Sequence, residues 1–174
     1  MTTFKEVGLQ EDILRAIQDL GFEKPTPIQE KSIPQIIENN VDVLALASTG
    51  TGKTAAFGLP IAQKIDTNNN SVQSIILSPT RELCRQIAQD IENYTKYRKG
   101  FKSVSVYGGA AIQNQIRDLK RGAQVVIGTP GRVIDLIKRG NLKLENIEIL
   151  VLDEADEMLN MGFKDDLDFI LSNT

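Results

Sequence analysis

The architecture of this chain is most clearly indicated by eight residues, Ala47-Ser48-Thr49-Gly50-Thr51-Gly52-Lys53-Thr54. They follow the apolar run 41–47 and precede a segment compatible with a helix. Glycines at this spacing let backbone N–H groups turn inward, toward the positive end of the following helix, and such a loop favours a phosphate group. Lys53 would add charge for the outer phosphates, and the Thr54 hydroxyl suits Mg²⁺. The usual pattern opens with Gly where this chain has Ala47, and the alternative is a Gly/Ser/Thr-rich turn with a solvated lysine.

Short apolar runs alternate along the chain with longer segments of helical period. This alternation is typical of a parallel sheet covered by helices on both faces. It predicts an α/β domain over residues 1–174 with strands at 41–47, 72–78, 103–107, 124–128 and 147–153. Ligands of such open sheets bind beyond the carboxyl ends of the strands, so we expect the chemistry in the loops that follow them.

The composition excludes several kinds of protein. The 174 residues include one cysteine and no histidine, which excludes an internal disulfide, a histidine zinc site and catalysis by histidine. The net charge of −3 argues against a generally basic protein surface that would bind nucleic acid. The chain has no secretory signal and no apolar run of about 18 residues, so we expect a soluble cytoplasmic protein with no membrane contact.

Two further patterns predict packing. Leu9, Ile13, Ile17 and Leu20 recur at helical spacing before Gly21, which predicts a buried helix face closed by a glycine cap. The single cysteine, Cys84, is expected to fill the core. The short basic stretch 96–102 is interpreted as a solvated helix end, with contact to RNA as the alternative.

An acidic group follows the last predicted strand, as Asp153-Glu154-Ala155-Asp156. Asp153, at the tip of a buried strand, is suited to hold Mg²⁺ largely through water, and Glu154 could orient an attacking water molecule. The alternative is that these acids stabilise the first turn of a helix, by about 0.3–1 kcal/mol each. Both interpretations can hold together.

These four residues spell the name motif of the DEAD-box RNA helicases, and the whole chain resembles their first RecA-like, ATP-binding domain. Phe4 and the segment 21–29, Gly-Phe-Glu-Lys-Pro-Thr-Pro-Ile-Gln, are similar to the Q motif of that family. The resemblance implies that Gln29 recognises the edge of adenine and that Phe4 stacks on the base. Thr26-Pro27-Ile28-Gln29 is also a capping box with proline at the first helical position, which is the structural alternative.

The resemblance also implies the full set of nucleotide residues. ATP would contact Phe4, Lys24, Thr26, Gln29, Ser48, Thr49, Gly50, Thr51, Gly52, Lys53 and Thr54. Thr54 and Asp153 would hold Mg²⁺, and the catalytic residues would be Lys53, Asp153 and Glu154. Asp156 would couple this domain to a second RecA-like domain.

Three loops resemble the RNA-facing motifs of the family: Pro79-Thr80-Arg81, Gly108-Gly109 and Thr129-Pro130-Gly131-Arg132. Each alone is ordinary turn chemistry. Together they would place backbone N–H groups or a hydroxyl at helix starts, beside an arginine, which suits binding to an RNA backbone without regard to sequence.

The resemblance implies an ATP-dependent RNA helicase, of which this chain is one core domain. The family's Ser-Ala-Thr motif does not occur before Thr174, so we expect the chain to stop short of it and to lack the second RecA-like domain. That domain would supply arginine fingers, whose loss lowers the rate of hydrolysis by about 10³ to 10⁵, so we expect the chain to bind nucleotide with negligible hydrolysis. We also expect the chain to be a monomer. The alternatives are a DNA-directed superfamily 2 helicase and a nucleotide-binding regulatory or docking module.

Overall fold

The computed structural model describes residues 2–38, 41–48 and 50–174. The chain divides into two compact units: the first comprises residues 1–65 and 89–99, and the second comprises residues 66–88 and 100–174. Within the described ranges, no helix is both long enough and apolar enough to cross a lipid bilayer.

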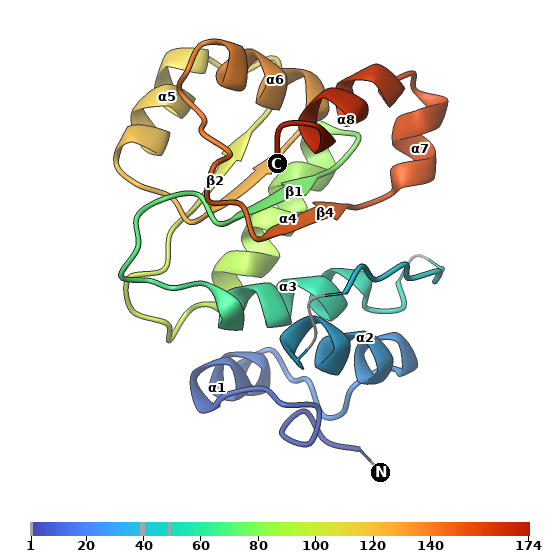
Figure 1. Ribbon diagram of the computed structural model, residues 1–174. Helices are drawn as coiled ribbons and strands as arrows, with labels where there is room; N and C mark the ends of the chain where they lie inside the picture. Colours follow the sequence, from blue (N-terminus) through green and yellow to red (C-terminus); the bar gives the residue numbers. More distant parts are fainter. Residues whose placement is uncertain (1, 39–40, 49) are drawn as a thin grey trace. The chain divides into compact units, whose positions relative to one another are not determined.

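The second unit is built on a parallel sheet of four strands in the order β2-β3-β1-β4 (Figure 1). The strands are β1 Ser74–Leu77, β2 Ser103–Val106, β3 Val125–Gly128 and β4 Ile149–Leu152. Leu77 pairs with both Gly128 and Leu152, and Val106 pairs with Gly128, so all four strands end level. This confirms four of the five predicted strands, each shorter than its predicted range.

Helices cover the sheet because most of its strand residues are apolar. One side packs in a single cluster with α5 Ile112–Lys120, α6 Pro130–Lys138, α7 Ala155–Asn160 and α8 Lys164–Leu171. Ile75 and Leu77 enter this cluster, whereas Ile76 points the opposite way and is equally shielded from water, at 0% exposure. Each such side chain contributes about 1.5–3 kcal/mol by its burial. The α/β fold with a parallel sheet flanked by helices is therefore confirmed.

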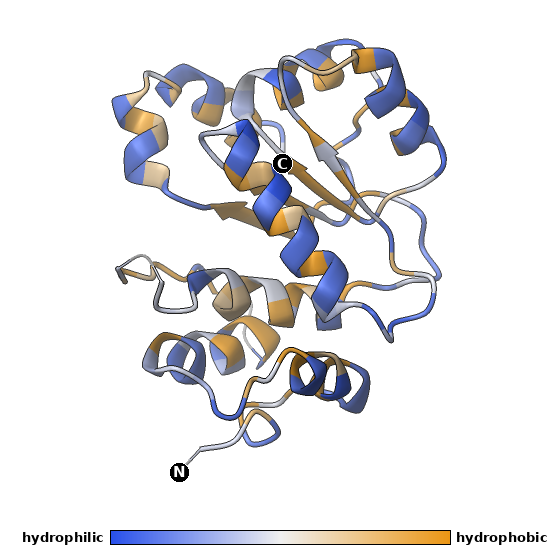
Figure 2. Ribbon diagram, turned by 180° about the vertical axis from the view of Figure 1, so that it is seen from behind, coloured by the Kyte–Doolittle hydropathy of each residue, from blue (hydrophilic) through white to orange (hydrophobic). Residues whose placement is uncertain are grey.

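The helix α4, Arg81–Tyr94, is amphipathic. It buries Cys84, Ile87, Ile91 and Tyr94 along one side, and Figure 2 shows hydrophobic bands alternating with hydrophilic ones along the helix. This spacing of three to four residues is what one face of a helix requires.

The first unit holds α1 Glu11–Asp19, α2 Pro27–Glu38 and α3 Lys53–Lys64. The predicted buried face is confirmed for Ile13 and Ile17 of α1 and for Leu9 just before it, but it is wrong for Leu20, which is 41% exposed. Leu20 lies beyond the last helical turn, where the chain reverses at Gly21 with φ +76°. The amides of Gly21 and Phe22 donate to the carbonyls of Gln18 and Ile17, at 3.0 Å each, and complete the expected glycine cap.

Part of the basic stretch 96–102 is bonded within the first unit. Arg98 Nη1 lies 2.9 Å from Asp12 Oδ2, and its Nη2 donates to the Gln63 carbonyl at 2.7 Å. Lys96 Nζ lies 2.6 Å from Asp19 Oδ2, which also accepts a bond from the hydroxyl of Tyr97. These side chains join the end of α4 to α1, which supports a scaffold role for this stretch.

The predicted strand 41–47 is wrong. These residues form no strand, and Leu44 and Leu46 are 88% and 87% exposed. A strand exists only where a neighbour completes its hydrogen-bond ladder. The segment belongs to the first unit, whereas the four strands all belong to the second, so an apolar β-forming sequence here lacks a strand partner among the described residues.

Cys84 lies in the core, as predicted. It is 0% exposed, and its Sγ is 3.0 Å from Ser78 Oγ at the end of β1. Burial raises the pKa of the thiol to about 11. The reactive thiolate is therefore scarce near neutral pH.

We expect Cys84 to react with a thiol reagent at pH 8 at least about a hundredfold more slowly in the native chain than in the unfolded chain, because few molecules carry the thiolate and the sulfur is covered. The measurement is the labelling rate with and without about 6 M guanidinium chloride, with a small-molecule thiol as the reference for reagent reactivity. Equal rates in the two conditions would show that Cys84 is accessible.

Candidate functional site

The loop predicted to bind phosphate leads into α3. Gly52 is the N-cap of the helix and has φ +88°, and the Thr51 hydroxyl donates to the Ser48 carbonyl at 2.7 Å to close the loop. A Cβ at Gly52 would collide with the side-chain amide of Gln29, so only glycine fits both the backbone angle and the space. Lys53 and Thr54 form the first turn of α3 and are half-buried, and Gly50 is exposed. Thr49 lies outside the described residues.

Gln29 connects the predicted Q motif to this loop. Its side chain is 3% exposed, its Oε1 accepts a bond from the backbone N–H of Thr26 at 3.0 Å, and its Nε2 donates to the Gly52 carbonyl at 3.1 Å. The first bond confirms one half of the capping box that the sequence offered as an alternative. A carboxamide has two N–H groups and two lone pairs, so one of each remains for a ligand, and adenine recognition stays a prediction.

The other half of the capping box is not formed. The Thr26 hydroxyl is buried and finds no hydrogen-bond partner among the described residues. It lies 3.3 Å from the position that a Cβ of Gly52 would take. An unsatisfied buried hydroxyl costs about 1–3 kcal/mol, and a ligand group that bonds to it would recover part of that free energy.

Phe4 and Lys24 differ in their surroundings. The Phe4 ring is 5% exposed and lies 6.1 Å from the ring of Phe22, which in turn lies 6.4 Å from that of Tyr94. Phe4 therefore belongs to an aromatic cluster of the first unit, and its stacking on a base stays a prediction. Lys24 is exposed, close in sequence to Thr26.

In the second unit, the acidic group follows β4. The backbone N–H of Asp153 donates to the Leu77 carbonyl at 2.9 Å, which continues the ladder by one residue. Glu154 then adopts φ +53° and ψ 50° and forms the N-cap of α7. It is the only non-glycine residue with positive φ in the described ranges, and such a conformation costs about 1–3 kcal/mol. Asp156 is exposed in the first turn of α7, where the helix dipole favours an acid.

The acids do not form a metal cage by themselves. Among the described residues there is no group of three or more acidic or cysteine side chains that could hold a metal ion. Mg²⁺ usually keeps several waters and binds one or two carboxylates together with substrate phosphates. A magnesium ion at Asp153 would accordingly need ligands from a bound nucleotide and water.

The loops after β1, β2 and β3 meet at the same edge of the sheet. The Thr80 hydroxyl accepts a bond from the Leu83 N–H at 3.2 Å and caps α4. Arg81 Nη1 lies 3.4 Å from the position of a Cβ on Gly109, which has φ +78°. The Thr129 N–H donates to the Val106 carbonyl at 3.1 Å, just before Pro130 begins α6. The structure thus brings the three predicted nucleic-acid loops together, with Pro79 buried and Gly108 and Gly131 exposed.

Arg132 is bonded to the protein itself. Its Nη1 donates to Gln115 Oε1 at 2.7 Å, and both of its terminal nitrogens lie 3.3 Å from the Ala110 carbonyl. Gln115 was missed by the sequence analysis, although one signal was present. Gln115 lies on the same side of α5 as Ile112, Ile116 and Leu119, and a polar side chain on such an apolar side is expected to form hydrogen bonds within the protein.

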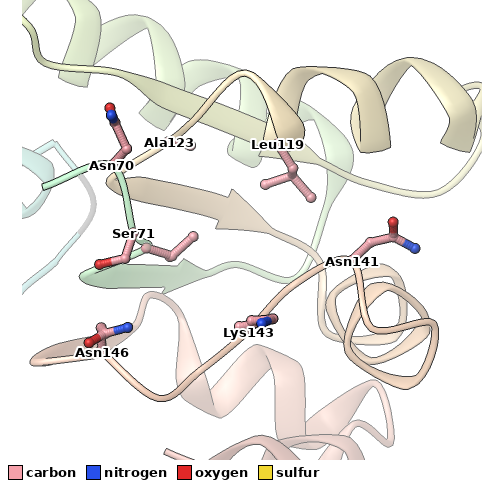
Figure 3. A pocket seen from close by; sticks show the side chains of 8 residues that line it. Asn70, Ser71, Leu119, Ala123, Asn141, Lys143 and Asn146 are labelled. Atoms are coloured by element: carbon pink, nitrogen blue, oxygen red, sulfur yellow. The ribbon is translucent and has the colours of Figure 1, made fainter.

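A pocket of about 180 Å³ opens at the opposite edge of the sheet, near the amino ends of the strands (Figure 3). None of the predicted site residues lines it. The lining residues are Asn70, Ser71, Val72, Leu119, Ala123, Asn141, Lys143 and Asn146.

The DEAD/DEAH box helicase family model matches residues 26–174. The chain therefore belongs to the DEAD/DEAH box helicase family.

Two curated relatives are similar over 98% of this chain. The ATP-dependent RNA helicase CshA of Listeria monocytogenes is 53% identical over 171 residues, which are 32% of that protein. The ATP-dependent RNA helicase DeaD of Haemophilus influenzae is 51% identical over 170 residues, which are 28% of its length. The chain thus spans about a third of the curated relatives it matches.

Solved structures show the same fold. A DEAD box protein from Methanococcus jannaschii matches 99% of this chain with a TM-score of 0.94 and 48% identity, over 47% of its own chain. The yeast DEAD-box splicing factor Prp28 matches 99% with a TM-score of 0.90 and 35% identity, over 42% of its own chain.

The strained backbone at Glu154 generates a stability prediction. We expect Glu154→Gly to raise the free energy of unfolding by up to about 1 kcal/mol, because glycine adopts positive φ without steric cost although it is more flexible when unfolded. For a chain of this size that corresponds to a rise of about 2–4 °C in the melting temperature.

The matched control is Glu157→Gly, which lies in α7 with ordinary helical geometry. It should lower stability by about 0.5–1 kcal/mol. The measurement is the melting temperature of both variants and of the wild type. A loss of stability in Glu154→Gly equal to that in Glu157→Gly would show that Glu154 is not strained.

Proposed function

We propose that this chain is the first core domain of a DEAD-box ATP-dependent RNA helicase, which binds ATP with Mg²⁺ and the backbone of RNA. With a second RecA-like domain, it would hydrolyse ATP to separate short RNA duplexes. The observation that carries the proposal is the bond from Gln29 Nε2 to the Gly52 carbonyl, because it joins the segment proposed to recognise the base to the loop proposed to hold phosphate. The names of the curated relatives, which describe ATP-dependent RNA helicases, support it.

The residues of the first unit fit a nucleotide. Gly52 opens α3 in a left-handed conformation, so the amides at the start of a twelve-residue helix are available to phosphate. The unsatisfied Thr26 hydroxyl lies beside Gly52 and would gain a partner. Lys53 would neutralise phosphate charge, and Gln29 would use its remaining N–H and lone pair on adenine.

Bound ATP and Mg²⁺ would supply the phosphoryl group for transfer to water. Thr54 and Asp153 would hold the metal, largely through water, and Glu154 would orient the attacking water molecule. Phosphoryl transfer needs positioning and charge neutralisation more than a protein nucleophile, which suits a chain without histidine.

RNA would bind at the carboxyl edge of the sheet. The helix α4 begins at Arg81, just after β1, and α6 begins at Pro130, just after β3, and the Arg81 guanidinium lies beside Gly109. Such contacts bind phosphates and carry no sequence information. The affinity would therefore fall steeply with salt and vary little among RNA sequences.

Two alternatives to an RNA helicase domain predict different results in binding and activity experiments. A DNA-directed helicase of this superfamily would prefer single-stranded DNA in a competition with RNA of the same sequence. A docking module would bind nucleotide without gaining activity. We expect negligible hydrolysis by the chain alone and RNA-stimulated ATPase activity once a second RecA-like domain of the family is added in trans.

Nucleotide binding tests the role of the Q motif directly. We expect Gln29→Ala to weaken binding of a fluorescent adenine nucleotide about tenfold, the equivalent of about 1.4 kcal/mol, and to reduce the preference over a guanine competitor. Lys53→Ala should weaken binding of both bases by at least as much, because it removes a phosphate charge.

The control is Gln18→Ala, an exposed glutamine on α1, which should bind like the wild type. The titration is repeated with adenine and guanine nucleotides for each variant. Binding that is indifferent to the base and to Gln29 would leave a phosphate-loop domain and remove the adenine-recognition role.

The magnesium role of Asp153 has a separate test. We expect Asp153→Asn to abolish most of the gain in nucleotide affinity that Mg²⁺ gives the wild type, while binding in EDTA stays unchanged, because asparagine lacks the carboxylate charge that would hold the metal. The exposed Glu157→Gln serves as the control for a lost charge nearby. An undiminished Mg²⁺ effect in Asp153→Asn would exclude Asp153 as a ligand.

A further inference from the structure

Arg132, predicted to contact RNA, directs much of its guanidinium inward. Its Nη1 donates to Gln115 Oε1 at 2.7 Å, and both terminal nitrogens lie within 3.3 Å of the Ala110 carbonyl. Hydrogen bonds from an ionised donor are shorter and about twice as strong as neutral ones. The planar guanidinium therefore holds two acceptors of the second unit in fixed positions.

Gln115 completes the connection. It is 6% exposed, and its Nε2 donates to the Tyr107 carbonyl at 3.1 Å while its Oε1 accepts from Arg132. One buried carboxamide thus satisfies a donor and an acceptor at once. Glutamate would lack the donor and leucine would lack both groups, so the side chain is specific for this position.

The two bonded carbonyls stand at either end of one loop. Tyr107 precedes Gly108-Gly109 and Ala110 follows it, while Arg132 belongs to the first turn of α6, just after Thr129 and Pro130. Gly108 and Gly109 are exposed and have no side chains with which to pack. The contacts of Arg132 and Gln115 therefore hold both ends of this glycine loop against the start of α6.

We propose that Gln115 is a positioning residue for nucleic-acid binding. Arg132 acts with it through hydrogen bonds within the protein and does not contact an RNA phosphate. Together they preorganise the Gly108-Gly109 loop and the start of α6 for the backbone of a single RNA strand. Preorganised donors bind without a further loss of conformational freedom. This inference rests on the proposed function, since it assumes that these loops bind RNA.

The experiment measures binding of a labelled single-stranded RNA to this chain and to Gln115→Leu. We expect at least about a tenfold loss of RNA affinity, equivalent to about 1.4 kcal/mol, with unchanged affinity for an adenine nucleotide. The matched control is Gln113→Leu, an exposed glutamine of the same helix, which should bind RNA like the wild type. Gln115→Glu keeps the acceptor for Arg132 and should lie between the two.

The salt dependence of RNA affinity distinguishes a positioning residue from a residue that contacts phosphate. Each phosphate charge pair with a single strand contributes about 0.7 to the slope of log affinity against log salt. Arg81→Gln should reduce the slope by about that amount. Arg132→Gln should lower the affinity and leave the slope unchanged, because no phosphate pair is lost.

The outcomes are distinguishable. Wild-type RNA affinity in Gln115→Leu, or a reduced slope in Arg132→Gln, overturns the inference and leaves the proposed function intact. An equal loss of RNA and nucleotide affinity, with a lower melting temperature, would mean a general structural role and also overturns it. A wild-type chain that binds adenine nucleotides but no RNA overturns both the inference and the RNA part of the proposed function.

Discussion

The parallel register of the four strands is the constraint on which the second unit depends. Because Leu77 is level with Gly128 and Leu152, and Gly128 with Val106, the four following loops begin at the same edge. Thr80 and Asp153 are about seventy positions apart in the sequence, and both reach that edge because the strands before them are paired in register.

The first unit depends on a more local interaction, the buried Gln29 amide. It caps α2 at Thr26 and bonds to the Gly52 carbonyl, so the loop that leads into α3 and the preceding helix are held by a single side chain. This is why glycine is required at position 52, where a Cβ would displace that amide. The capping interpretation and the functional interpretation of Gln29 are therefore compatible, since a carboxamide can serve both.

Much of the fold follows from the sequence, because apolar runs and helical periods are local signals. Four strands, the face of α1 and the burial of Cys84 were predictable in this way. The segment 41–47 was not, because its apolar pattern says nothing about whether a neighbouring strand is present to pair with it. The partners of Arg132 also depend on packing: the sequence places an arginine at a helix start, but only the fold brings Gln115 within 2.7 Å of it. The left-handed backbone of Glu154 likewise has no sequence signal.

Hydrogen exchange of the chain with ATP and Mg²⁺, with GTP and Mg²⁺, and with single-stranded RNA would locate each ligand without any substitution. We expect ATP to protect the segments around Gln29 and Lys53 more than GTP does, and RNA to protect the loops at Thr80, Gly109 and Thr129. Equal protection by the two nucleotides, or protection by RNA only at the pocket lined by Asn70 and Asn141, would contradict the proposed function.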